Sequence, residues 1–189
     1  MKKIVMLFVL AVAFTTTMHA QRLLPGQRGL QLSLGLPITE SKLFDNGNFI
    51  AGLSLTINHK RANHWLIGLE YSKKHLAYRN EQIPVETFVL EGGYMVNLFA
   101  DAGKNLLLNT GVSAIGGYEV INRSESLLYD GATLLDKNRF VYGGAYHLAL
   151  DMFATDNLIL FIKGKCNVLW NSDVEMFRPQ IGAGIRIVF

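Results

Sequence analysis

The sequence predicts an all-β fold, an antiparallel transmembrane up-and-down β-barrel of about eight strands. Three observations support this prediction. Apolar residues alternate with small or polar residues in segment after segment, the connections between these segments alternate in length, and the last segment ends on an aromatic residue. A barrel wall that faces lipid requires apolar side chains outside and small or polar side chains inside. After residue 20, no stretch is continuously apolar over the length of a spanning helix.

The first three expected strands show the alternation in its simplest form. Segment 29–36 places four leucines on one face and Gln, Ser and Gly on the other. Segments 49–58 and 65–73 alternate large apolar residues with Gly, Ser, Thr, Asn and Glu. Because successive side chains of a strand point to opposite faces, each segment predicts a strand that is apolar on one side only.

Three longer segments repeat the pattern, at 86–98, 106–121 and 140–153. Their apolar faces are rich in Leu, Val and Tyr, and their opposite faces carry Gly, Ser, Asn and several charges. Glycine doublets such as Gly92 and Gly93 lie inside these segments, so they indicate bends or close packing of the wall. A phosphate-binding loop would instead precede a helix.

The last two expected strands are 158–170 and 177–189. In the second of these, alternate residues point in one direction: Ile181, Ala183, Ile185, Ile187 and Phe189. A terminal aromatic residue looks like the carboxy-terminal signal of bacterial outer-membrane barrels. We therefore expect a barrel-assembly signal, formed by Ile185, Ile187 and Phe189.

The connections separate a membrane barrel from a soluble β-sandwich or a lipocalin. They are long at 37–48, 74–84 and 122–139, short at 59–64, 99–105 and 154–157, and of moderate length at 171–176. Short periplasmic turns and longer outer loops are typical of membrane barrels. An even number of strands then places both termini in the periplasm. Aromatic residues near the strand ends are candidates for two interfacial girdles: Phe49, Trp65, Tyr71, Phe99, Tyr118, Phe140, Trp170, Phe177 and Phe189.

Residues 1–20 have the order of a secretory signal peptide. Lys2 and Lys3 precede an apolar run from Ile4 to Phe14, and Ala20 is a suitable cleavage residue. The alternative is an uncleaved anchor, although the run is shorter than the ~20 residues of a spanning helix. We expect cleavage near Ala20, a barrel domain over 21–189, and location in the bacterial outer membrane.

Charge and cysteine content exclude several functions. Removing Lys2 and Lys3 lowers the formal net charge from +3 to +1. This near-neutral value does not indicate nucleic-acid binding. The single cysteine, Cys166, excludes an intramolecular disulfide and a cysteine-based metal cluster.

The charged residues of the expected inner face form a balanced set. A barrel of about eight strands has an interior just wide enough for side chains, and buried charges have to be paired. We therefore expect a structural ion-pair network in the lumen, made by Glu70, Glu91, Asp151, Lys163, Lys165 and Arg186. The alternative is a functional site or a gated pore.

Signs of an enzyme are absent. His147 and Asp151 lie on one face of a strand, about 13 Å apart by strand rise. That separation is too large for a direct hydrogen bond. We expect no catalytic residue, no cofactor, no metal site and no small-molecule substrate.

The whole chain after residue 20 resembles the TraO family of conjugative transposon proteins from Bacteroides-type bacteria. The resemblance is carried by the junction 18–22 and by the segments 29–31, 69–71, 88–94, 109–111, 116–119, 142–144 and 179–186. It implies a part in conjugative DNA transfer, as an envelope component of a type IV secretion-like apparatus. It implies outer-membrane lipid and other conjugation-apparatus proteins as partners, and it supplies no catalytic residue.

A second hypothesis is a free-standing small outer-membrane barrel that acts as an adhesin or surface-protective protein through its outer loops. For both hypotheses the connection 122–139 is a possible partner loop, because it is unusually apolar. Its apolar residues are Leu127, Leu128, Tyr129, Leu134 and Leu135.

Overall fold

The computed structural model describes residues 23–38, 47–78, 81–103, 105–122, 138–172 and 175–189. Within these ranges, no helix has the length and apolar character needed to cross a membrane. A short 3-10 turn, η1 (Lys60–Ala62), lies between two of the strands.

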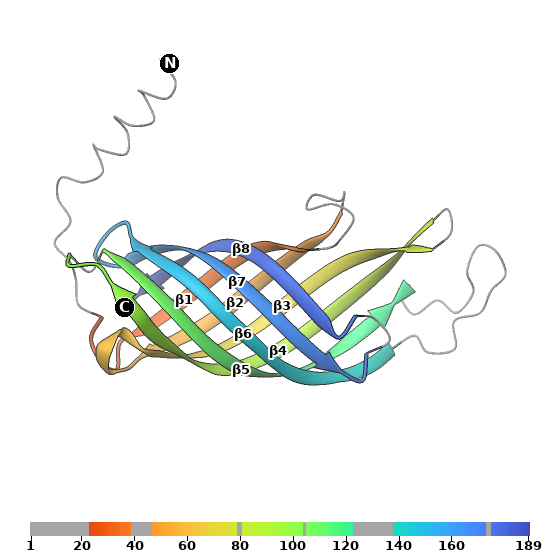
Figure 1. Ribbon diagram of the computed structural model, residues 1–189, viewed down its shortest axis with the longest axis horizontal. Helices are drawn as coiled ribbons and strands as arrows, with labels where there is room; N and C mark the ends of the chain where they lie inside the picture. The colour runs from red at the N-terminus through yellow and green to blue at the C-terminus, as the bar shows by residue number, and fades with distance from the viewer. Residues whose placement is uncertain (1–22, 39–46, 79–80, 104, 123–137, 173–174) are drawn as a thin grey trace, which may run out of the picture.

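Eight antiparallel strands form a closed barrel, in which each strand pairs with its neighbours in sequence and β8 pairs with β1. The strands are β1 (Arg28–Pro37), β2 (Phe49–Asn58), β3 (His64–Tyr78), β4 (Glu81–Ala100), β5 (Leu106–Ile121), β6 (Asn138–Phe153), β7 (Leu158–Trp170) and β8 (Phe177–Val188). The up-and-down barrel predicted from the sequence is therefore confirmed. The start of β1 and the end of β8 lie at the same end of the barrel, called here the termini end (Figure 1).

The stagger of the strands fixes the tilt of the wall. We start at Arg28 and move from each residue to its partner on the next strand, and after β8 is reached this path has arrived at Pro179. The carbonyl oxygen of Pro179 accepts a hydrogen bond from the N–H of Ile38, which closes the circuit ten residues after Arg28. The shear is thus 38 − 28 = 10 residues, which is about 33 Å along the strands against about 38 Å around eight strands. The corresponding tilt of about 40° lies in the range of transmembrane barrels.

The outer surface of the wall is apolar, as the alternation predicted. Leu34, Leu53 and Leu69 point outward and are exposed. Aromatic rings gather toward both ends of the wall, where Tyr71 lies 4.7 Å from Phe88 and Trp65 lies 4.8 Å from Tyr94 between ring centroids. Such rings are typical of the two membrane–water interfaces.

One predicted connection is wrong. The segment 74–84 was expected to be a long loop, but β3 and β4 continue through it, with pairing from Lys73–Glu86 up to Tyr78–Glu81. β2 ends opposite Lys73, and β5 pairs with β4 only as far as Val85. The pair of strands therefore extends beyond the rest of the wall, where neither strand has a second neighbour.

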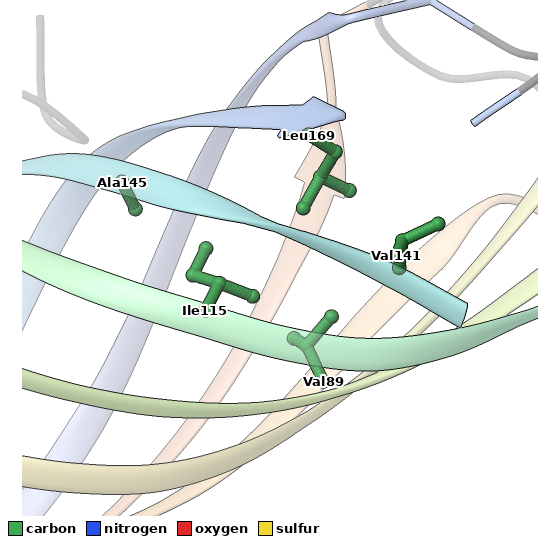
Figure 2. Packing of buried hydrophobic residues seen from close by; sticks show 5 residues of the cluster. All are labelled: Val89, Ile115, Val141, Ala145 and Leu169. Carbon is green, nitrogen blue, oxygen red and sulfur yellow. The ribbon is translucent and has the colours of Figure 1, made fainter. Parts of the chain in front are cut away.

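The inner surface carries apolar side chains as well as the polar ones that were expected. They form three clusters: Val89, Ile115, Val141, Ala145 and Leu169; Leu66, Met95 and Ala149; and Leu107, Phe153, Ile159 and Val188. Figure 2 shows the first cluster, in which β4, β5, β6 and β7 direct side chains toward one another. The clusters alternate with polar groups along the lumen. On β6, for example, apolar Ala145, Ala149 and Phe153 alternate with His147 and Asp151.

Candidate functional site

The centre of the lumen holds a buried lysine between two buried glutamates. The Nζ atom of Lys165 lies 3.1 Å from Glu70 Oε2 and 2.6 Å from Glu91 Oε2. The side chain of Gln180 donates to both carboxylate oxygens of Glu70, at 3.0 and 3.1 Å. Lys163 lies farther out, 4.0 Å from Glu70. One ammonium thus contacts both carboxylates, Lys163 supplies the second positive charge, and the Gln180 amide donates to both oxygens of Glu70.

His147 belongs to this central group. Its Nε2 atom lies 2.8 Å from the hydroxyl of Ser113 and 3.8 Å from Glu91 Oε2. Asp151, on the same strand, is hydrogen-bonded to Asn109 and Arg186.

A second buried group surrounds Asp151, nearer the termini end. Arg186 donates to Asp151 Oδ2 at 2.8 Å, and Asn109 donates to the same oxygen at 2.9 Å. The Nε and Nη2 atoms of Arg186 both donate to the side-chain oxygen of Gln31, at 3.1 and 3.0 Å. The six charges predicted for the lumen therefore fall into two groups, one of four residues and one pair.

A third polar group closes the opposite end of the lumen, called here the outer end. Arg178 lies 2.7 Å from Glu119 Oε2 and donates to the hydroxyls of Ser172 and Thr87. The hydroxyl of Ser172 donates to Glu119 at 2.7 Å. Sequence reasoning missed Arg178, although it shares the inward face of β8 with Gln180 and Arg186.

The family follows from comparison of the sequence. The model of the conjugative transposon protein TraO family matches residues 24–189. This chain belongs to the TraO family. No curated protein matches this family member in sequence.

Solved structures show the same fold at low identity. The attachment invasion locus protein Ail of Yersinia pestis, in complex with the heparin analogue sucrose octasulfate, is 9% identical with a TM-score of 0.57, over 88% of this chain and all of Ail. Neisserial surface protein A is 11% identical with a TM-score of 0.57, over 87% and 97%. The N-terminal β-barrel domain of Pseudomonas aeruginosa OprF is 8% identical with a TM-score of 0.54, over 87% and 98%. The TraO-family chain therefore has the fold of outer-membrane β-barrels.

The lumen of this TraO-family barrel leaves little open space. A cavity of about 40 Å³, lined in part by Glu70, Arg178 and Gln180, has room for about one water molecule. A much larger hollow, about 960 Å³, lies against exposed wall residues such as Leu34, Leu53 and Phe88. Most of its lining is apolar, as expected of a lipid-facing groove.

Other predicted residues of the TraO-family chain lie at the ends. Ile185, Ile187 and Phe189 point to the exposed face of β8, and the N–H of Phe189 donates to the carbonyl of Arg28 at 2.9 Å. The possible partner loop, with Leu127, Leu128, Tyr129, Leu134 and Leu135, lies outside the described residues. In the part of the chain that the structure describes, no group of His, Cys, Asp or Glu could hold a metal ion.

Proposed function

We propose that this TraO-family barrel is an outer-membrane component of a conjugative, type IV secretion-like DNA transfer apparatus, with a structural rather than a catalytic role. The match of the family model over residues 24–189 carries the proposal. The filled lumen supports a structural role, because Lys165, Arg178 and Arg186 each pair with a buried carboxylate there. The apolar outer wall supports anchoring in the outer membrane.

The proposal includes the topology. Residues 1–20 are removed as a signal peptide near Ala20, and both termini of the mature barrel lie in the periplasm. The short turns at the termini end then face the periplasm, where other proteins of the apparatus can contact them. Trypsin added to whole cells should spare an epitope inserted after Gly103, in one of these turns, and should cleave that epitope after the outer membrane is permeabilised.

The test of function is the mating frequency of a donor with an in-frame deletion of the gene. We expect transfer to fall by orders of magnitude and to be restored by the intact gene supplied in trans. A complementing copy that carries Lys165→Met together with Glu91→Gln should also restore transfer if it assembles, because no chemistry depends on these residues. Unchanged transfer in the deletion strain would contradict the proposal and would favour an adhesin or surface-protective barrel.

A further inference from the structure

The rim at the termini end is unevenly charged. The turn between β2 and β3 exposes Lys60 and Arg61, and Arg28 is exposed on the neighbouring strand, opposite Ile57. The turn between β4 and β5 contains one acidic and one basic residue, Asp101 and Lys104, and the turn between β6 and β7 contains Asp156. Positive charge is therefore concentrated on the side formed by β1, β2 and β3.

These three cations differ from those elsewhere in the barrel. Six others have carboxylate partners within 4.0 Å: Lys73, Lys74, Lys163, Lys165, Arg178 and Arg186. Arg28, Lys60 and Arg61 form no ion pair with any residue that the structure describes. Their charges are available to a ligand.

The turn that carries Lys60 and Arg61 has a defined backbone conformation. Arg61 and Ala62 have φ angles of 61° and 60°, and the N–H of Asn63 donates to the carbonyl of Lys60 at 3.4 Å. Two successive left-handed residues make a type I′ hairpin turn, which residues other than glycine and asparagine adopt at a cost. The side-chain oxygen of Asn63 also accepts a hydrogen bond from the N–H of Asn97 on β4, at 2.9 Å. The turn is therefore anchored to a second strand.

The cations lie directly beside the lipid-facing wall. Arg28, Ile57, Trp65 and Tyr94 are successive cross-strand partners on its outer face. The ring of His59 lies 3.1 Å from the hydroxyl of Tyr94, and the indole of Trp65 is 54% exposed. Aromatic rings with neighbouring Lys and Arg are typical of the level of lipid headgroups.

We propose that Arg28, Lys60 and Arg61 form a binding site for the phosphate headgroup of an anionic phospholipid, whose acyl chains lie against Ile57 and Trp65. The inference rests on the membrane location in the proposed function, but not on the role in conjugation. The direct continuity of the cations with the apolar wall favours a lipid over an acidic soluble protein, because such a protein would contact the turn without covering Ile57 or Trp65.

Trp65 can report the lipid beside it. The chain has two tryptophans, and Trp170→Phe leaves Trp65 alone. This variant is reconstituted into phosphatidylcholine vesicles with increasing fractions of either brominated phosphatidylglycerol or brominated phosphatidylcholine, and the quenching of Trp65 gives the relative affinity of the two lipids. We expect phosphatidylglycerol to be preferred about fivefold, the effect of about one cation near a membrane surface.

Variants of the turn distinguish an effect of its positive charge on the lipid preference from an effect of its structure. Lys60→Gln combined with Arg61→Gln should reduce the preference to about one, whereas Lys60→Arg combined with Arg61→Lys should keep it. Lys73→Gln, on the outer rim, is the matched control and should leave it unchanged. Equal quenching by the two lipids, or a preference that survives the double Gln variant, would overturn the proposal. Quenching by brominated phosphatidylcholine itself shows that the barrel is inserted, and mating frequency tests the conjugative role separately.

Discussion

The ammonium of Lys165 lies 2.6 Å from a carboxylate oxygen of Glu91, with 0% and 3% of the two side chains exposed. Lys165 also forms an ion pair with Glu70 on β3, the strand next to β4, which carries Glu91. The contact therefore connects β7, on one side of the barrel, to β3 and β4 on the other. Removing this lysine leaves two buried carboxylates with only the more distant Lys163 as a counter-charge.

Lys165→Met should lower the free energy of unfolding by about 3–5 kcal/mol, because breaking a buried ion pair leaves an uncompensated charge. Urea titration in lipid vesicles, followed by tryptophan fluorescence, measures the change. Combining Lys165→Met with Glu91→Gln leaves Glu70 opposite Lys163, and at least half of the loss should return. If Lys165→Met alone were as stable as the original chain, the ion pairs of Lys165 would contribute nothing to stability.

The purified barrel should show no ion conductance in planar bilayers. Three apolar clusters and three bonded polar groups fill the lumen in alternation. Replacing Val89 and Val141 by Ser should admit water at the outer end without producing current, because Phe153 and Ile159 still close the termini end. Discrete single-channel steps from the unmodified protein would contradict this description of the lumen.

Substitution by alanine should change the stability of the barrel differently at two glycines of the wall. A Cβ atom at Gly143 would overlap the carbonyl oxygen of Val168 on the adjacent strand, whereas a Cβ atom at Gly164 would meet nothing within 4 Å. Gly143→Ala should therefore destabilise the barrel by about 1–3 kcal/mol, as overpacking does. Gly164→Ala should be neutral or stabilising by up to about 1 kcal/mol. The same urea titration compares the two variants, and equal effects would contradict the prediction.

Ala62→Gly should stabilise the β2–β3 turn. Ala62 has a φ angle of 60°, in the left-handed region where glycine carries no steric cost. Relief of that strain should raise the free energy of unfolding by about 1 kcal/mol. Ala102→Gly, in the turn between β4 and β5, is the control, since Ala102 is not among the residues with positive φ. A destabilised Ala62→Gly variant would mean that the turn is not strained.

Phe189→Ala tests the assembly signal. If Phe189 is read by the insertion machinery, the variant should accumulate less folded barrel in cells, measured as the fraction that migrates differently on gels without heating. Refolding of the purified variant in detergent should be nearly unchanged, because the Phe189 side chain is exposed. Equal losses in cells and in detergent would show a role in stability instead.

The wall of this barrel could be predicted from the sequence, since lipid on one side imposes strict alternation. The bounds of β2, β5 and β7 agree with the predicted segments 49–58, 106–121 and 158–170. The extension of β3 and β4 was missed because both of its faces lie beyond the apolar part of the wall.

The interior could be predicted only in part. The charges of the inner face were identified, but not which would pair, since Asp151 and Arg186 come from β6 and β8, which are not neighbours in the sheet. The inward apolar residues were missed for a related reason. Val141 precedes outward-facing Tyr142, and Leu169 precedes outward-facing Trp170, so in the sequence each looks like part of an apolar run.

The filled lumen has a consequence for the transferred nucleic acid. A DNA strand carries a negative charge at each phosphate, and its passage would need a wide aqueous route with mobile counterions. The filled lumen of this barrel provides no such route. If the barrel belongs to a conjugation apparatus, as proposed, the strand would have to cross the outer membrane through another protein, and this barrel would contact its partners at its two rims.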